Sequence, residues 1–177
     1  VKQLASDDPV TILLAARAIG GIGLPAPDAI EPLKSLLASD RTELRCAAVA
    51  ALCSQGERAH PLAPRIIELL GREDIPGCLE DARGLHHLGP HVVPLLKQWL
   101  ESSSSRVRML GVENLRLMGS EGLEAIEALQ SLLDDPVENL RFAAFHALHD
   151  ICTASGIPAA GVTAYVKALK DTQAFIR

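Results

Sequence analysis

Apolar residues in the stretch 134–151, DDPVENLRFAAFHALHDI, recur with the spacing of one helix face. They are Leu140, Ala143, Ala144, Ala147, Leu148 and Ile151, which follow the i, i+3, i+4, i+7 pattern of a helix. Asp135, Pro136 and Glu138 before them have the order of an N-cap, a first-turn proline and a capping-box acid. Because small residues dominate this face, the pattern predicts a helix that another helix approaches closely.

The same pattern returns along the whole chain with a nearly constant period. Equivalent positions hold Ile19, Leu52, Leu85, Leu115 and Leu148, whose sequence numbers differ by 33, 33, 30 and 33. A second series precedes the first at a constant offset: Leu4, Leu37, Leu70, Leu100 and Leu133. Such periods are typical of solenoids built from helix pairs. We therefore expect about five antiparallel helix pairs, and burial of the eight leucines from Leu37 to Leu148 in these two series.

The predicted helix ends follow from local residue types. First helices are expected within 29–39, 61–71, 91–101 and 123–134, and second helices after Asp8, Asp40, roughly Asp74, Ser104 and Asp135. Glycine follows four residues after most of the repeat positions, at Gly23, Gly56, Gly89 and Gly119, where it can end a helix in the left-handed conformation. No segment alternates with a period of two for long enough to predict a strand.

Composition narrows the class of protein further. The chain has 177 residues, of which 48% are hydrophobic but only 3% aromatic, so a core of Leu, Ile, Val and Ala is expected. The 17 Lys and Arg against 22 Asp and Glu give a net charge of −5, which disfavours binding to nucleic-acid phosphates. No apolar run is long enough to span a bilayer, and no signal-peptide pattern opens the chain.

The four cysteines are Cys46, Cys53, Cys78 and Cys152, and they show no CxxC spacing. We interpret them as buried thiols within helices rather than as disulfides or metal ligands. Together with the absence of a bilayer-spanning run, this interpretation predicts a cytoplasmic protein.

Three segments carry the residues of a known repeat family: Leu44-Arg45-Cys46-Ala47-Ala48, Val107-Arg108-Met109-Leu110-Gly111 and Leu140-Arg141-Phe142-Ala143-Ala144. An apolar residue and an arginine ahead of a small-residue helix resemble HEAT repeats of the short bacterial type. The resemblance implies an all-α, right-handed superhelix in one domain, 1–177, with repeats near 1–23, 24–56, 57–89, 90–119, 120–153 and 154–177. Ile12 and Cys78 stand where the repeat pattern expects arginine. Pro76 and Gly77 weaken the start of the second helix in the third repeat.

Both ends match only part of a repeat. Val1 to Ala5 correspond to the tail of a first helix, and 171–177 to the opening of a second. Because the end repeats of a solenoid normally carry a polar cap, we expect a longer parent chain or self-association through the end repeats. Degenerate end helices that cap the array are the alternative.

Candidate chemistry is weak in this sequence. Arg45, Arg108 and Arg141 are interpreted as scaffold residues that bond to the turn aspartates Asp40, Asp134 or Asp135. Histidines cluster at His86, His87 and His91, and His146 and His149 lie three apart. HEAT-repeat metal hydroxylases carry His-Glu dipeptides, which this chain lacks. We therefore predict no metal, cofactor or catalytic residue.

The leading hypothesis is a non-catalytic scaffold or adaptor that binds a protein or peptide on the face formed by the second helices. The alternative is an enzyme or enzyme subunit of the HEAT-like lyase or metal-hydroxylase type. Removing the predicted core from two second helices leaves the candidate binding residues Met109, Val112, Arg116, Phe142, Phe145, His146 and His149. An apolar strip with a polar rim is typical of an interaction surface, although Met109 and Phe142 also suit the seam between repeats.

Overall fold

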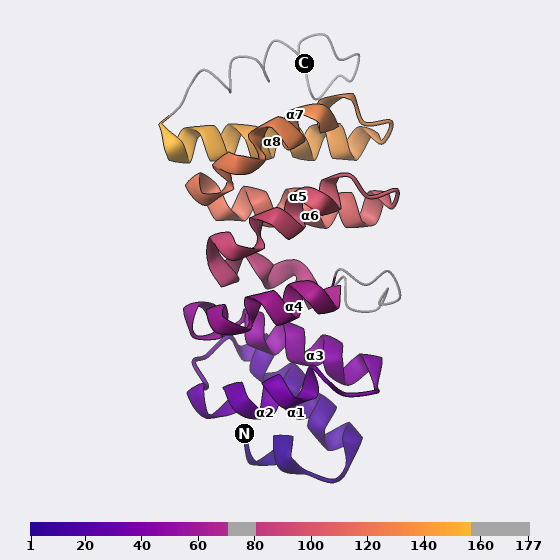
Figure 1. Ribbon diagram of the computed structural model, residues 1–177, viewed down its shortest axis with the longest axis vertical. Helices are drawn as coiled ribbons and strands as arrows, with labels where there is room; N and C mark the ends of the chain where they lie inside the picture. Colours follow the sequence, from indigo (N-terminus) through magenta and orange to yellow (C-terminus); the bar gives the residue numbers. More distant parts are fainter. Residues whose placement is uncertain (71–80, 157–177) are drawn as a thin grey trace. The chain divides into compact units, whose positions relative to one another are not determined.

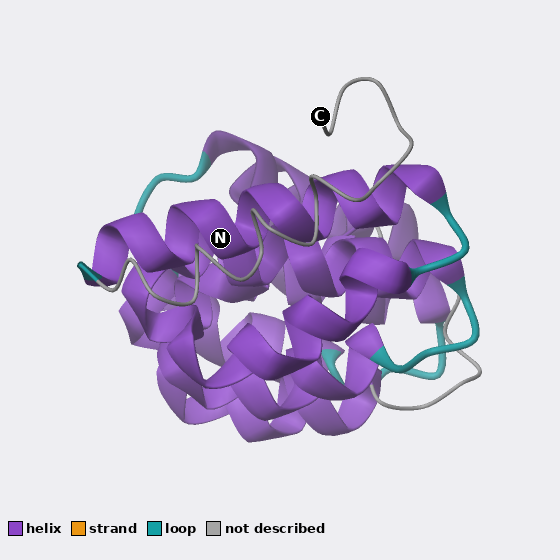
Figure 2. Ribbon diagram, turned by 90° about the horizontal axis from the view of Figure 1, so that it is seen from above, coloured by secondary structure: helices purple, strands orange, loops and turns teal. Residues whose placement is uncertain are grey.

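The computed structural model of the chain describes residues 1–70 and 81–156. Every regular element within these ranges is a helix (Figure 2). The contacts divide the chain into two compact units, Val1–Val92 and Val93–Arg177 (Figure 1). The predicted fold class, an all-α superhelix of stacked helix pairs, is confirmed. The single domain 1–177 with partial end repeats stays a prediction, and each unit is described by itself below.

The first unit consists of short first helices and longer second helices. Its elements are η1 (Lys2–Ala5), α1 (Pro9–Ile22), η2 (Pro27–Ala29), α2 (Ile30–Leu36), α3 (Thr42–Cys53), η3 (Gly56–Leu62), α4 (Ala63–Leu70) and η5 (Asp81–Val92), where η denotes a 3₁₀ helix. The second helices form one layer, in which α1 packs against α3 and α3 against η5. Pro32 and Pro64 lie in the first turns of α2 and α4, where a missing N–H is tolerated.

The second unit repeats this arrangement. Its elements are α5 (Val93–Leu100), α6 (Ser105–Met118), η6 (Gly119–Ala125), α7 (Ile126–Ser131), η7 (Leu132–Asp134) and α8 (Glu138–Ser155). α6 packs against α5 on one side and against α8 on another, and α7 packs against α8. The approach of α5 to α6 is close, because a Cβ atom added at Gly111 would lie 2.9 Å from Leu100 Cδ2. Glycine is therefore the residue that this crossing accommodates.

All eight leucines expected in the core are buried. Their side chains are at most 7% exposed, and Leu52, Leu85, Leu115 and Leu148 are 0% exposed. A nearly all-aliphatic core follows, in which both helices of each pair contribute one leucine at a fixed place. The period of the leucines along the sequence thus reports a real packing period.

Glycines end two of the second helices as expected, Gly23 after α1 and Gly119 after α6, whereas the C-cap of α3 is Ser54 and Gly56 is the first residue of η3. Gly23, Gly56, Gly89 and Gly119 have φ values of 64°, 58°, 70° and 56°, a conformation that other residues adopt only with strain. The last second helix ends later than the predicted stretch 134–151, because α8 continues to Ser155 and its C-cap is Gly156, with φ 66°. Cys152 stands where the other repeats have glycine, so no left-handed residue stops the helix there.

Two of the predicted helix starts are wrong in detail. Asp40 does not cap α3, whose N-cap is Arg41 without a side-chain cap bond. Asp135 does not cap a helix at Pro136, since α8 begins at Glu138 after Val137. The Asp135 carboxylate accepts bonds from the Arg108 side chain of α6, and its Oδ1 also accepts one from the backbone N–H of Val137 ahead of α8. Asp8, by contrast, caps α1 as predicted, accepting bonds from the N–H groups of Val10 and Thr11.

The prediction of four cysteines outside disulfides is wrong for Cys46, which is buried and disulfide-bonded. Spacing along the chain, on which the prediction rested, does not report proximity in space. Cys53 and Cys152 are buried thiols. Burial raises the pKa of Cys53 to about 12. Cys78, like the predicted helix start near Asp74 and its interruption at Pro76 and Gly77, lies outside the described residues.

Candidate protein-binding surface

Six residues form two matched rows on the neighbouring helices α6 and α8. The α6 row holds Met109, Glu113 and Arg116, and the α8 row holds Phe142, His146 and His149. Within each row the spacings are four and three residues, so each row runs along one helix face. Corresponding members of the two rows occupy equivalent positions of successive repeats, and α6 packs directly against α8. We call these six residues the α6–α8 band.

The α6–α8 band is accessible to solvent. Arg116, His146 and His149 are exposed, whereas Met109, Glu113 and Phe142 are partly buried. Met109 and Phe142 therefore contribute to packing and also present some surface. Glu113 is not among the predicted binding residues, although it occupies the repeat position equivalent to that of His146.

Val112 is a correction to the predicted site. Its side chain is 1% exposed, so it belongs to the core and presents nothing to a partner. It lies three residues before Leu115, which belongs to the recurring leucine series, and the equivalent residues of the earlier repeats are also buried. These are Ala16, Val49 and Ala82, each 0% exposed. The position is one where successive repeats pack together.

Phe145 occupies the same repeat position as Val112, three residues before Leu148. Its side chain is partly buried, and its ring lies 5.5 Å from that of His146 in an edge-to-face arrangement. By this repeat position we assign Phe145 to the seam between repeats, with the α6–α8 band beside it. Val112 and Phe145 therefore lie outside the α6–α8 band, whereas the other five predicted residues lie within it.

Ring contacts organise the α8 row. Phe142 and His146 lie one turn apart, with ring centroids 4.3 Å apart and an interplanar angle of 73°. Edge-to-face contacts of this kind are favourable for aromatic rings. The contact holds the imidazole of His146 against the helix at an exposed position and so restricts its orientation.

An ion pair links the two helices at the other end of the α6–α8 band. Arg116 Nη1 donates to Asp150 Oδ2 at 3.1 Å, and the two side chains are 43% and 41% exposed. Exposed pairs contribute little to stability, so the guanidinium can exchange this partner for another carboxylate at small cost. The α6–α8 band therefore offers a cation, a carboxylate and aromatic rings within two helix faces.

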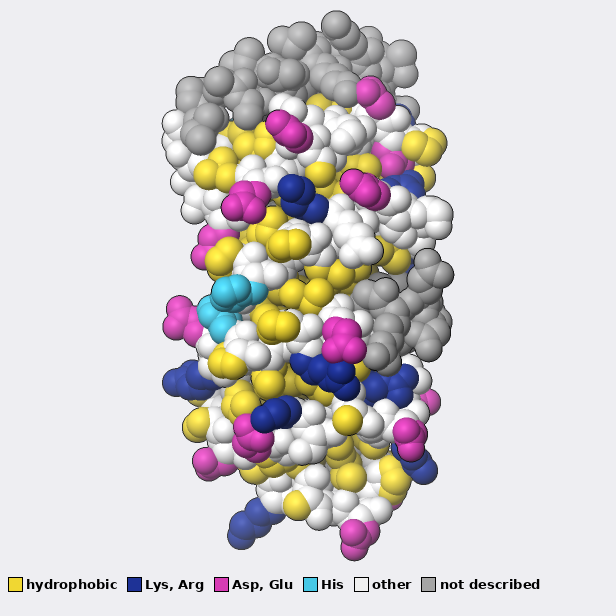
Figure 3. All heavy atoms as spheres, viewed as in Figure 1, with side chains coloured by type: hydrophobic (Ala, Val, Ile, Leu, Met, Phe, Trp, Pro, Cys, Tyr) yellow, Lys and Arg dark blue, Asp and Glu magenta, His cyan; other side chains and the backbone are white. Residues whose placement is uncertain are grey.

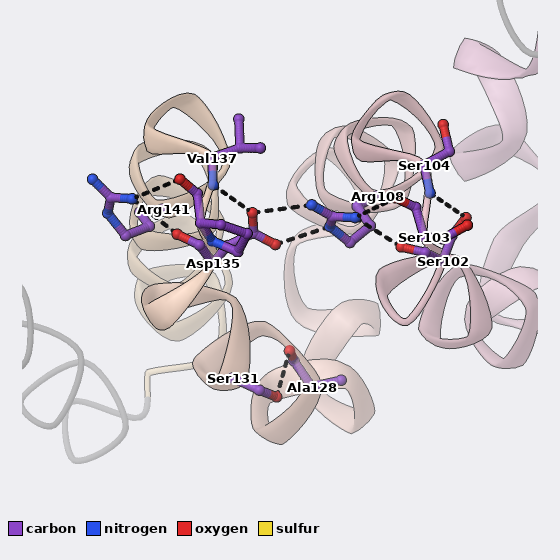
Figure 4. A network of polar contacts seen from close by, with 10 residues as sticks. Ser102, Ser103, Ser104, Arg108, Ala128, Ser131, Asp135, Val137 and Arg141 are labelled. Atoms are coloured by element: carbon purple, nitrogen blue, oxygen red, sulfur yellow. Dashed lines mark hydrogen bonds and ion pairs between the residues drawn. The ribbon is translucent and has the colours of Figure 1, made fainter.

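A separate network of arginines belongs to the scaffold, as predicted (Figure 4). Arg108 bonds through Nε and Nη2 to both carboxylate oxygens of Asp135, at 2.9 and 3.1 Å, and the two side chains are 11% and 5% exposed. Arg108 Nη1 also donates to the carbonyl of Ser102, and Arg141 Nη1 to that of Asp135. In the first unit Arg45 donates to the carbonyl of Ser39 and to the hydroxyl of Thr42, rather than to the predicted Asp40. These guanidinium groups are already satisfied by the turns that they hold.

The remaining histidines lie in the first unit. The rings of His60 and His91 are 5.9 Å apart, and those of His86 and His87 are 4.0 Å apart. Desolvation, and then the neighbouring His86, lower the pKa of His87. Within residues 1–70 and 81–156, no group of three or more His, Cys, Asp or Glu side chains converges on a possible metal position.

Charge is distributed rather than concentrated on the face drawn in Figure 3. Lys and Arg side chains and Asp and Glu side chains are both visible there, with apolar atoms between them. No patch of one sign dominates this view. Among the described helices none has the length and apolar character needed to cross a bilayer.

Stacked pairs of antiparallel helices with a constant repeat define a helical repeat protein of the α-solenoid class. Residues 92–174 match the sequence model of the family described as HEAT repeats. This segment of the chain thus resembles HEAT repeats, and the described helix pairs have the architecture of such repeats. No curated protein sequence matches the chain.

Several solved structures share the fold over nearly the whole chain. The complex of CpcE and CpcF of phycocyanin lyase from Nostoc sp. PCC7120 is similar over 99% of this chain and 71% of that chain, with a TM-score of 0.70 and 24% identity. An engineered protein reaches 0.66 over 99% and 91% of the two chains, with 20% identity. A designed armadillo repeat protein in complex with the peptide (KR)4 reaches 0.59 over 99% and 92%, with 17% identity. These likenesses show a common fold.

Proposed function

We propose that the protein is a non-catalytic scaffold whose α6–α8 band binds a protein or peptide segment. The observation that carries this proposal is the register of the two rows. Equivalent residues of two packed helices present side chains at matched heights, so an extended segment that crosses both helices meets one row after the other. The designed armadillo protein, whose helices have a related arrangement, is in complex with a peptide.

The composition of the α6–α8 band supports binding to protein. Arginine, methionine and aromatic residues are enriched at protein interfaces, and Arg116, Met109 and Phe142 supply one of each. Glu113 and the imidazoles of His146 and His149 add hydrogen-bonding groups of both kinds. A surface of this mixture selects a partner by shape and hydrogen bonding, whereas a purely electrostatic surface selects by charge alone.

The test is a quantitative capture of partners by the tagged chain, with identification by mass spectrometry. The band variant carries Arg116→Ala and His146→Ala, both at exposed positions, and the matched control carries Lys97→Ala and Gln98→Ala on the exposed face of α5. We expect the band variant to lose its specific partner at least about tenfold, as for loss of interface anchors, while the control retains it.

Helicity by circular dichroism should be unchanged in both variants, because all four side chains are exposed. A folded band variant that captures the same partner in the same amount as the unmodified chain would remove the α6–α8 band from consideration.

The enzyme alternative is compatible with the likeness to CpcE and CpcF, which is a likeness of fold at 24% identity. A lyase or hydroxylase of this class needs a bound chromophore, substrate or metal. Metal analysis and the absorbance spectrum of the purified protein distinguish the two functions. A stoichiometric metal or chromophore would favour the enzyme over the scaffold.

A further inference from the structure

Two arginines of the first unit occupy the same repeat position and have no ionic partner among the described residues. Arg17 of α1 and Arg83 of η5 lie two residues before Ile19 and Leu85, which are members of the recurring series. Both side chains are exposed, and neither guanidinium forms an ion pair or a hydrogen bond with a residue in 1–70 or 81–156. Each is therefore available to a carboxylate of another chain.

This repeat position stays accessible where a preceding second helix is present. Arg83 is exposed although α3 precedes η5 and packs against it. Ala50 of α3, the equivalent residue between the two arginines, is partly exposed although α1 packs against α3. Successive second helices thus pack through other faces, and a further helix packed on α1 in the same way would leave Arg17 accessible.

The packing of the three helices fixes the spacing of the two cations. α1 and η5 both pack against α3, so Arg17 and Arg83 lie on either side of Ala50, whose methyl group reaches neither guanidinium. Axes of packed helices are about 8–10 Å apart, so two steps across the layer separate the arginines by roughly 16–20 Å. An extended chain covers this distance in about five or six residues. We call Arg17, Ala50 and Arg83 the Arg17–Arg83 surface.

Carboxylates of the same helices do not neutralise this surface. Arg17 is the only charged residue of α1. The only carboxylate of α3 is Glu43, seven residues before Ala50 and so about 10 Å away along the helix. The local charge at this level of the layer is therefore positive, although the whole chain carries a net charge of −5.

We propose that the Arg17–Arg83 surface binds an extended acidic segment of a partner protein, whose carboxylates meet the two arginines about five or six residues apart. Charge complementarity supports this occupant, because two cations without partners favour a segment that brings two separated negative charges. A long polyanion such as a nucleic acid is disfavoured, since the net negative charge of the chain repels its phosphates beyond this surface. The surface lies in the other unit from the α6–α8 band and does not depend on it.

Fluorescence anisotropy with a labelled synthetic peptide tests this surface on the full chain at low salt. The peptide consists of glycine and serine and carries two Glu-Glu pairs separated by about five residues. Arg17→Glu and Arg83→Glu each raise its dissociation constant at least about threefold, because an attraction becomes a repulsion at an exposed position. The matched control is Arg58→Glu, at an exposed arginine of η3 in the same unit, which alters the net charge equally and leaves binding nearly unchanged.

A second peptide tests the spacing. It has the same composition, with its four glutamates adjacent, and it binds the unmodified chain at least about threefold more weakly, because it reaches only one arginine at a time. No measurable binding of the spaced peptide, equal binding of the two peptides, or an equal loss with Arg58→Glu overturns the proposal. So does a single-stranded oligonucleotide that binds this surface more tightly than the spaced peptide. The variant with Arg116→Ala and His146→Ala keeps its affinity for the peptide, so failure here is distinct from failure of the α6–α8 band.

Discussion

Single residues in this protein act through the place that the repeat gives them. Leu115 and Leu117 are two residues apart on α6, yet the first is 0% and the second 52% exposed. Asp8 and Asp135 both stand next to a proline just before a second helix, yet one caps its helix and the other binds an arginine. Residue type alone therefore does not determine the role, because the neighbouring helix decides it.

Shortening one of the buried, recurring leucines should lower the free energy of unfolding. Leu115→Ala removes fully buried methyl groups and leaves a cavity, so we expect a loss of about 2–5 kcal/mol in the free energy of unfolding. Leu117→Ala is the matched control on the same helix, and its change should stay within about 0.5 kcal/mol. Urea denaturation followed by circular dichroism measures both. Similar losses for the two variants would show that the repeat register is misassigned.

The cap of α1 should depend on pH. Bonds from the Thr11 hydroxyl and from the backbone N–H groups of Thr11 and Val10 lower the pKa of Asp8 below its usual 3.8. A lowered pKa in the folded state means that the ionised cap stabilises the protein above pH 3.8, and that this contribution is lost as the pH falls through the folded value.

Asp8→Ala should therefore lower the melting temperature at pH 7. The difference from the unmodified chain should shrink as the pH is lowered below 3.8. Asp7→Ala, at the adjacent exposed aspartate, is the control. A difference between Asp8→Ala and the unmodified chain that is the same at pH 7 and pH 2 would contradict a charged cap.

At the scale of helices, the sequence predicted the positions of the helix pairs better than it predicted the contacts between them. The leucine period and the glycines located the helix pairs, because both depend on local geometry that recurs in every repeat. The start of α8, the burial of Val112 and the disulfide at Cys46 were not predicted. Each depends on a neighbouring element that is distant in sequence, and no single helix pattern contains that information.

The buried pair that joins α6 to the turn before α8 should couple strongly. Removing either Arg108 or Asp135 leaves the other charge buried without its partner, which typically costs about 3–5 kcal/mol. A double-mutant cycle with Arg108→Ala and Asp135→Ala measures the coupling. The control is the exposed pair Arg116 and Asp150, for which we expect about 0–1 kcal/mol. Equal coupling in the two pairs would contradict a scaffold role for Arg108.

At the scale of the whole molecule, the repeat assigns each face of a second helix a distinct task. One face packs on the preceding repeat, a second packs on the following one, and a third is free to vary. Residues on this third face, such as Arg116 and His146, differ from repeat to repeat, whereas the buried leucines recur. The sequence therefore predicted the accessible face of these helices only to within one residue, because the buried Val112 and the partly buried Glu113 are adjacent at the border between two faces.

Site-specific photo-cross-linking tests the central claim, that the α6–α8 band contacts the partner. A photoreactive phenylalanine analogue placed at His146 should give a covalent adduct with the captured partner. The same analogue at Lys97, an exposed residue of α5, should give none. Adducts from position 97 but not from position 146 would contradict the proposed surface.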